Sequence, residues 1–315
     1  MKNSMKKGLL FISFLLLLVG CKGYKTDKQA EEAYAKTDST WVADTVYQAG
    51  LKYCYGTVWA GDRLLISNYG GEVMDPLNVD KTGYIMQLKD GVLSEYIPAG
   101  TLMAPKGMAV LGNYLFVADI NCVMVFDMTD LSKAPQVMQL PENNMFVSDL
   151  VIQDSLLYVS VRDAGLIYKT EVNEPANVAN ATMDIFLTTV SGPNGMTAYK
   201  DTMYVCSYPQ NDSIGKQNAI YMVLNMKDLN PMLYKLESLP GYYCGIQYDP
   251  KTRMVYYTDR INGQLRSIDM ATGANKLLLP EKILLSPQML TLQGNKLFVP
   301  DVDASRLYVF TIPGK

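Results

Sequence analysis

The chain of 315 residues contains no histidine. Histidine is the most common general base at neutral pH and the most common metal ligand, so its absence argues against many familiar enzyme sites. The chain also contains no GxSxG or HExxH phrase. Basic residues are few, 28 Lys and Arg against 31 Asp and Glu, and no run of them stands out. We therefore expect no nucleic-acid partner, and the composition favours a non-catalytic protein.

Cysteines are also few, and none of them are closely spaced. There are five, and no CxxC pair suggests a metal site. Cys206 and Cys122 fall in separate repeat units that are not neighbours. Cys54 and Cys244 lie near the starts of their units, with another unit between them. We expect mostly free thiols beyond Cys21.

The first 21 residues, MKNSMKKGLLFISFLLLLVGC, have the pattern of an export signal. Three lysines precede an apolar run, Leu9–Val19, that is too short to span a membrane comfortably. The ending Leu18-Val19-Gly20-Cys21 resembles the lipobox of bacterial lipoproteins, in which the cysteine is acylated, for example with palmitate. An ordinary signal peptide or an uncleaved anchor that carries a cysteine here is the alternative. Either would export the chain.

Residues 22–39 are polar and charged and show no strand period. They are interpreted as a tether between a lipid anchor on Cys21 and a folded domain over residues 40–315. Without the three signal-peptide lysines, 25 basic residues stand against 31 acidic ones, a net charge of −6. The expected location is the bacterial cell envelope, anchored to a membrane and facing the periplasm or the cell exterior.

A short phrase recurs six times along the chain. Two of its copies read KGMAVLGNYLFVAD and QMLTLQGNKLFVPD, and successive copies begin 42 to 51 residues apart. The copies start at Tyr55, Lys106, Ser148, Asn194, Cys244 and Gln288. A repeat of this length is typical of propellers and solenoids.

The second copy predicts the internal plan of one unit. Apolar strands are expected over Gly107–Leu111 and Tyr114–Ala118, joined by a Gly-Asn turn. Two more follow at Val123–Met128 and Gln136–Leu140. Four antiparallel strands within about 45 residues make one propeller blade.

The last unit has only three strands, and the chain offers a fourth from its other end. These strands are expected over Met289–Gln293, Lys296–Val299 and Arg306–Ile312. The segment Trp41–Gln48 precedes the first unit and has no partner of its own. Pairing it with the last blade would remove an open sheet edge. The predicted fold is therefore all-β, a six-bladed β-propeller closed by an N-terminal strand. An open β-solenoid would leave that strand unexplained.

Aspartates recur at the ends of the second strands. Asp119, Asp259 and Asp301 occupy the same point of their units, and Asp127 and Asp269 lie in third-strand turns. A residue repeated in register is more often a structural turn cap than a site. We expect these five carboxylates to stabilise turns.

The phrases SGPNGMTAYKDTMYVCSY and KLFVPDVDASRLYVFTI resemble the six-bladed propellers of the gluconolactonase and senescence-marker-protein type and the related NHL-repeat propellers. The resemblance covers residues 40–312. It implies a divalent metal at one end of the channel, held by a Glu, an Asn and an Asp. Asn194 matches the Asn, but the Glu position falls on Tyr55, the Asp position on Cys244, and a further Asn near Val147. We therefore expect no metal, no cofactor and no catalytic residue.

One alternative remains open, a divergent metal-dependent, lactonase-like hydrolase that uses the channel mouth around Asn194. Asp149 could assist it. However, Asp149 lies one residue past the start of its strand, where the alternation of side chains would direct it away from the channel.

The six strand-start residues are expected to ring one mouth of the channel. This ring is Tyr55, Lys106, Ser148, Asn194, Cys244 and Gln288, with Tyr243 beside it. A polar and aromatic ring without an acidic cluster suits hydrogen bonding and stacking. The predicted function is a ligand- or protein-binding module whose ligand is a small molecule, for example a sugar, or a protein.

Overall fold

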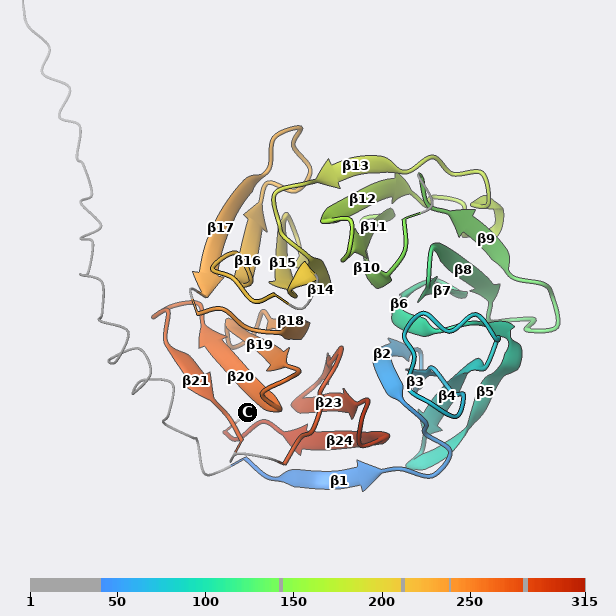
Figure 1. The fold of residues 1–315 in the computed structure, drawn as a ribbon, viewed down its shortest axis with the longest axis horizontal. Coiled ribbons are helices and arrows are strands. Elements are labelled where there is room, and N and C mark those ends of the chain that lie inside the picture. Colours follow the sequence, from blue (N-terminus) through green and yellow to red (C-terminus); the bar gives the residue numbers. More distant parts are fainter. Residues whose placement is uncertain (1–40, 142–143, 211–212, 238, 280–282, 315) are drawn as a thin grey trace, which may run out of the picture.

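The computed structural model describes residues 41–141, 144–210, 213–237, 239–279 and 283–314. The expected signal peptide (1–21), with Cys21, and the expected tether (22–39) lie outside the described residues. Six four-stranded sheets stand around a central channel (Figure 1). This confirms the predicted six-bladed β-propeller. No helix in the described part of the chain is long and apolar enough to cross a membrane.

In blades one to five the strands run outward from the channel in chain order, and blade six takes its outermost strand, β1, from the start of the described chain. Blade one contains β2 (Cys54–Ala60), β3 (Arg63–Asn68), β4 (Gly83–Lys89) and β5 (Val92–Leu102). Blade two contains β6 (Pro105–Leu111), β7 (Tyr114–Asp119), β8 (Cys122–Asp127) and β9 (Gln136–Gln139). Blade three contains β10 (Val147–Gln153), β11 (Leu156–Val161), β12 (Leu166–Glu171) and β13 (Asp184–Leu187), with the 3₁₀ helix η2 (Pro175–Asn177) before its last strand.

The other three blades repeat the plan. Blade four contains β14 (Pro193–Tyr199), β15 (Thr202–Ser207), β16 (Ile220–Leu224) and β17 (Met232–Glu237). Blade five contains β18 (Tyr243–Asp249), β19 (Met254–Asp259), β20 (Gln264–Asp269) and β21 (Asn275–Leu277). Blade six contains β22 (Thr291–Gln293), β23 (Lys296–Asp301), β24 (Arg306–Thr311) and β1 (Ala43–Tyr47).

The strand β1 closes the ring as predicted. It pairs antiparallel with β24, and Tyr47 lies opposite Leu307. Just before β1, the buried Trp41 packs against Tyr256 of blade five, with ring centroids 6.1 Å apart. The two ends of the described chain are thus held in one sheet (Figure 1). The innermost strand of blade six, β22, is shorter than predicted and begins at Thr291.

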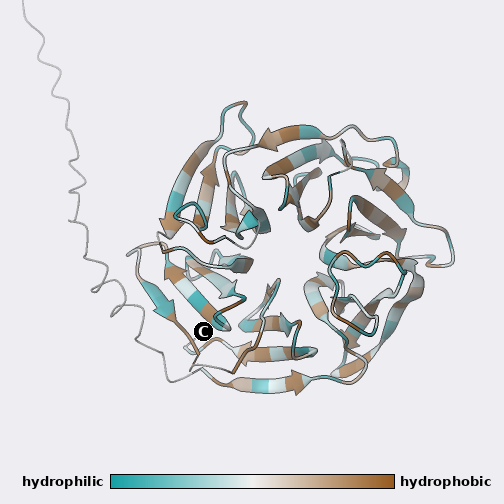
Figure 2. Cartoon of the chain, viewed as in Figure 1, coloured by the Kyte–Doolittle hydropathy of each residue, from teal (hydrophilic) through white to brown (hydrophobic). Residues whose placement is uncertain are grey.

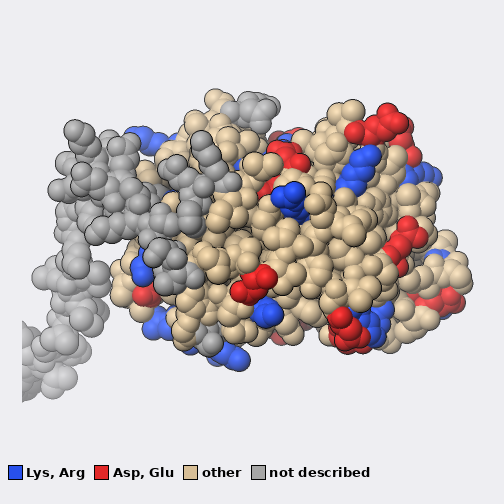
Figure 3. Space-filling model, turned by 90° about the horizontal axis from the view of Figure 1, so that it is seen from below, with Lys and Arg blue, Asp and Glu red and all other residues tan. Residues whose placement is uncertain are grey.

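Apolar side chains fill the layers between neighbouring blades. The largest cluster joins blades two and three through residues such as Val125, Met138 and Val159. Figure 2 shows the corresponding alternation of hydrophobic and hydrophilic residues along the strands. On the edge of the ring drawn in Figure 3, acidic and basic side chains are interspersed. The four described cysteines are buried free thiols.

The innermost strands approach one another closely because glycine follows the strand-start residue in most blades. A Cβ on Gly195 would lie 2.0 Å from the carbonyl oxygen of Cys244, and one on Gly245 would lie 2.4 Å from that of Gln288. No side chain fits at such distances. Glycine therefore allows the strand-start residues of adjacent blades to gather around a narrow channel.

Buried hydroxyl groups connect neighbouring blades at the same level, at every second blade interface. The Ser160 hydroxyl accepts from the Asp149 amide at 3.0 Å and donates to the Asn194 carbonyl of the next blade at 2.7 Å. Equivalent bonds are Ser67 to the Lys106 carbonyl and Thr258 to the Gln288 carbonyl. These bonds hold three of the strand-start residues in place.

The repeated aspartates are structural, as expected, but Asp119 and Asp301 accept from amides 15 and 16 residues earlier in the chain rather than only within their own turns. Asp119 accepts from the amides of Met103 and Ala104 at 2.9 and 2.7 Å. Asp301 does the same for Leu285 and Ser286 at 2.7 and 3.0 Å. The remaining members accept amide hydrogen bonds in their own turns, Asp259 from Asn262, Asp127 from Thr129, and Asp269 from Ala271.

Candidate functional site

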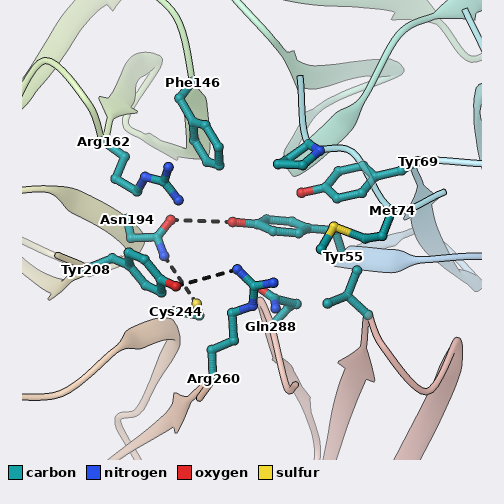
Figure 4. Close-up of a pocket in the computed structure, with 12 residues that line it drawn as sticks. Tyr55, Tyr69, Met74, Phe146, Arg162, Asn194, Tyr208, Cys244, Arg260 and Gln288 are labelled. Carbon is teal, nitrogen blue, oxygen red and sulfur yellow. Dashed lines mark hydrogen bonds between the residues drawn. The ribbon is translucent and has the colours of Figure 1, made fainter. Parts of the chain in front are cut away.

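Four of the predicted ring residues line a cavity at one end of the channel. They are Tyr55, Asn194, Cys244 and Gln288, and they come from blades one, four, five and six (Figure 4). The cavity volume is about 10 Å³, roughly what one water-sized group requires. We call this space the mouth cavity. It is narrow because long side chains enter it from several blades.

Lys106 and Ser148 occupy their expected places in the strands but lie behind the cavity wall. The fully buried Lys106 Nζ donates to the Ala104 carbonyl at 3.1 Å. It also lies 4.8 Å from the centroid of the Phe146 ring, which lines the cavity. The Ser148 hydroxyl donates to the Phe146 carbonyl at 3.4 Å. Both residues therefore support Phe146 from behind.

Tyr243 does not line the mouth cavity, contrary to expectation. Its ring packs edge-on against Tyr257 at 5.3 Å, and its hydroxyl donates to the Leu239 carbonyl at 2.9 Å. Successive side chains of a strand point in opposite directions, so Tyr243 points away when Cys244 points into the cavity. Only the Tyr243 carbonyl takes part, accepting from Asn194 Nδ2 at 3.3 Å.

A second ring, which sequence reasoning missed, completes the cavity. Its members are the residues immediately after the second strand of each blade, Tyr69, Ile120, Arg162, Tyr208, Arg260 and Val302. All except Ile120 line the cavity. A recurrent backbone bond places them, for example Arg260 N to Tyr242 O at 2.9 Å and Tyr208 N to Gly192 O at 2.8 Å. The repeat alignment could have identified these residues, because each of them lies one position after the end of its second strand.

Two arginines of the second ring bring positive charge to the mouth. Arg162 stacks on Phe146, with its Cζ 3.4 Å from the ring centroid, and its Nε pairs with Asp163 at 2.8 Å. Arg260 donates from Nε to the Ser286 hydroxyl at 2.9 Å and from Nη1 to the Tyr208 hydroxyl at 3.5 Å. Within the described ranges, Arg260 forms no ion pair.

The ionisable groups of the cavity wall stay protonated near neutral pH. Burial raises the pKa of Tyr55 well above its ordinary value, and the positive charges of Arg162 and Arg260 oppose this shift only in part. Burial also raises the pKa of the Cys244 thiol to about 12. A protonated thiol is a poor nucleophile and a poor metal ligand. The wall therefore offers neutral hydrogen-bonding groups and two guanidinium ions.

Two buried polar atoms of the cavity wall have no hydrogen-bond partner among the residues that the structure describes. They are the hydroxyl of Tyr69, whose side chain is 2% exposed, and Oε1 of Gln288, which is 1% exposed. The other end of the Gln288 amide, Nε2, donates to the Ser286 carbonyl at 3.2 Å. Buried polar groups are nearly always paired, so such atoms in a cavity wall mark a place where a bound group can complete them.

Asn194 is held by other residues of the mouth. Its Oδ1 accepts from the Tyr55 hydroxyl at 3.5 Å, and its Nδ2 contacts Cys244 Sγ at 3.3 Å. No group of three or more His, Cys, Asp or Glu side chains in the described part of the chain could hold a metal ion. None of the described residues that line the mouth cavity with Asn194 carries a carboxylate.

Asp149 takes an unexpected position. Its carboxylate accepts from the Met196 amide at 2.8 Å and lies where a Cβ on Gly107 would meet it. Because Gly107 has no side chain, the carboxylate turns into the channel rather than away from it. It lines a wider cavity of about 310 Å³ that does not include Asn194. Burial raises the pKa of Asp149 to about 7.

No family model and no curated protein sequence matches this chain. Solved structures do match its shape. One is a catalytically inactive virginiamycin B lyase from Staphylococcus aureus with quinupristin, with a TM-score of 0.57, 13% identity, and coverage of 85% of this chain and 98% of that one. Another is the nidogen/laminin complex, with a TM-score of 0.56, 12% identity, and coverage of 73% and 90% respectively. At such identities the likeness shows the propeller fold alone.

Proposed function

We propose that this protein is a lipid-anchored, extracytoplasmic β-propeller that binds a ligand at the mouth cavity and does not catalyse a reaction on it. The observation that carries the proposal is the pair of unpartnered buried atoms, Tyr69 Oη and Gln288 Oε1, in the wall of one cavity at the channel mouth. An unpaired buried polar group costs about 1–3 kcal/mol. A propeller that keeps two of them in one cavity wall gains when a ligand supplies the missing partners.

The chemistry of the cavity favours binding over catalysis. Among the described residues no carboxylate lines it, the chain has no histidine, and burial keeps the Cys244 thiol protonated by raising its pKa to about 12. The amine of Lys106, whose pKa burial lowers to about 7, lies behind Phe146 and Tyr69 rather than in the cavity. A hydrolase would need a base or nucleophile in contact with its substrate.

The location rests on the sequence alone. The basic start, the apolar run and the lipobox-like ending at Cys21 support export and acylation. Acyl chains on Cys21 would hold the propeller at a membrane face, and residues 22–39 would serve as the tether.

The substitution Tyr69→Phe tests the binding proposal. Removing an unpartnered hydroxyl should leave the free energy of unfolding unchanged or raise it by up to about 1 kcal/mol. The same substitution should weaken any ligand that a thermal-shift screen of sugars, organic acids and peptides finds for the wild-type chain. Tyr221→Phe is the matched control, because the Tyr221 hydroxyl donates to the Gln217 carbonyl at 2.6 Å and its loss should destabilise the fold.

The opposite pattern would contradict the proposal. If Tyr69→Phe destabilised the chain as much as Tyr221→Phe does, the Tyr69 hydroxyl would have a structural partner, and the cavity would lose its main mark of a binding site.

A further inference from the structure

We propose that the mouth cavity recognises a carboxylate with a hydrogen-bond donor on the neighbouring carbon, the group shared by α-hydroxy acids and the C-terminal residue of a peptide. The carboxylate would lie between Arg162 and Arg260, and the donor would face Gln288. This inference rests on the proposed binding function and names the chemistry of the ligand.

The charge of the cavity selects an anion. Arg162 and Arg260 come from blades three and five, and Figure 4 shows both side chains reaching into the same space. Their positive charges act together on Tyr55, Tyr69 and Tyr208, lowering the pKa of each against the larger effect of burial. Among the described residues no carboxylate lines the cavity itself; Asp163 pairs with Arg162 Nε at 2.8 Å, whereas Arg260 has no ionic partner there. This positive site lies in a chain with a net charge of −3, so the charge is local rather than general.

The arginines have donors available for the anion. Arg260 is bonded only to neutral hydroxyls in the described structure, those of Ser286 and Tyr208. Arg162 pairs with Asp163 through Nε, and within the described residues no hydrogen bond is found for its two Nη groups. Stacking on Phe146 fixes the plane of this guanidinium. Planar guanidinium groups suit the two oxygens of a carboxylate.

The two unpartnered atoms, Tyr69 Oη and Gln288 Oε1, indicate which ligand groups would lie beside the arginines. The Tyr69 hydroxyl can donate to a carboxylate oxygen. Gln288 Oε1 is an amide oxygen and can only accept, and the bond from Nε2 to the Ser286 carbonyl sets this orientation of the amide. An acceptor facing Tyr69 and a donor facing Gln288 would satisfy both atoms. A hydroxyl or N–H beside a carboxylate meets this condition, and a simple fatty acid does not.

The size of the cavity limits how much of the ligand enters. At about 10 Å³ the cavity has room for one water-sized group, so a carboxylate and its neighbouring donor would enter only if the long side chains at the mouth, Arg162 and Arg260 among them, move apart. Met74 and Pro76 of the loop after β3 line the same rim. We expect the body of a larger ligand to rest against this loop.

Calorimetric titration of the purified full chain with matched small acids tests the inference. Lactate has both groups, propionate lacks the hydroxyl, and methyl lactate lacks the charge. We expect lactate to bind about tenfold more tightly than propionate and methyl lactate to show no binding. N-acetylalanine and its methyl ester form a second arm, which distinguishes a peptide C-terminus from a free hydroxy acid by which of the two acids binds more tightly.

Variants separate the two parts of the site. Arg260→Met should reduce lactate affinity about tenfold or more, whereas Lys276→Met, which removes an exposed charge from the outer strand of the same blade, should not. Gln288→Met should abolish the preference for lactate over propionate. Circular dichroism melting would show that each variant is folded.

Several results would overturn the inference. Equal binding of lactate and methyl lactate, or lactate binding that survives Arg260→Met, would mean that the cavity does not recognise a carboxylate. If neutral sugars bound instead and Tyr69→Phe weakened them, the binding function would stand without the carboxylate. If neither acids nor neutral ligands bound, both proposals would fail.

Discussion

The Tyr55 hydroxyl donates a hydrogen bond to Asn194 Oδ1 across the channel, at 3.5 Å (Figure 4). The two residues belong to blades one and four, which lie opposite each other in a ring of six. Their contact bridges the channel at its mouth and forms part of the floor of the mouth cavity. Asn194 also donates to the Tyr243 carbonyl of blade five, so one amide side chain joins three blades.

We expect Asn194→Ala to lower the free energy of unfolding by about 1–3 kcal/mol, because it leaves buried partners in blades one and five without their hydrogen bonds. Urea denaturation would measure the change. Asn173→Ala is the control, since Asn173 is exposed and its side chain bonds Glu171 alone within the described structure, and it should cost less than about 0.5 kcal/mol. Equal effects of the two variants would argue against a bridging role.

Ring closure depends on the residue that precedes β1. Trp41 is 4% exposed, whereas its neighbour Val42 is 64% exposed. Trp41→Ala should therefore cost about 3–5 kcal/mol of unfolding free energy, and Val42→Ala close to none. Deletion of residues 41–48 should be more severe and lead to aggregation, because it exposes the edge of β24. A deletion variant that remains monomeric with an unchanged melting temperature would contradict this closure.

The hydroxyl groups that join neighbouring blades should also contribute to the free energy of unfolding. Ser160→Ala removes a partner from both the Asp149 amide and the Asn194 carbonyl. The expected loss is about 1–3 kcal/mol, measured by chemical denaturation. Ser94→Ala, at an exposed position of β5, should change stability by less than about 0.5 kcal/mol.

The buried carboxylate of Asp149 makes stability depend on pH. Burial raises its pKa from 3.8 to about 7, so the folded state holds a proton that the unfolded state releases. Its contribution is therefore fully present below about pH 4 and is lost as the pH rises through about 7. The difference between wild type and Asp149→Asn in unfolding free energy should follow this curve, with an amplitude on the order of a few kcal/mol. A flat difference between pH 4 and 8 would contradict it.

Lys106→Met provides a comparison, because the contribution of Lys106 to the unfolding free energy depends on pH in the opposite direction from that of Asp149. Burial lowers the pKa of Lys106 from 10.5 to about 7, Asp119 opposes this shift, and Arg162 adds to it. The contribution of Lys106 is present above about pH 10.5 and is lost as the pH falls through about 7.

The anchor proposal concerns residues outside the described structure. Cys21→Ala should release the protein from membranes or leave an uncleaved precursor, because the acyl chains would have no attachment site. Membrane fractionation with immunoblotting would show this. A variant of mature length that still sediments with membranes would contradict a lipid anchor on Cys21.

The sequence alone determined the architecture. Six copies of one phrase and alternating apolar residues predict six blades, because each four-stranded unit must bury its faces against its neighbours. The missing strand of the last unit and the unpaired segment before the first predict the closure. The repeated aspartates predict structural carboxylates, but the sequence did not show that Asp119 and Asp301 bind amides 15 and 16 residues earlier in the chain.

Only the tertiary structure decided the content of the mouth cavity. Arg162 and Arg260 are 98 residues apart in the chain, and they share a cavity because ring closure directs the ends of all second strands to one face. Tyr243 and Cys244 are adjacent, yet only Cys244 reaches the cavity, because neighbouring side chains in a strand point in opposite directions. A one-residue difference in register reverses such an assignment, and register is determined by packing against neighbouring blades rather than by the local sequence.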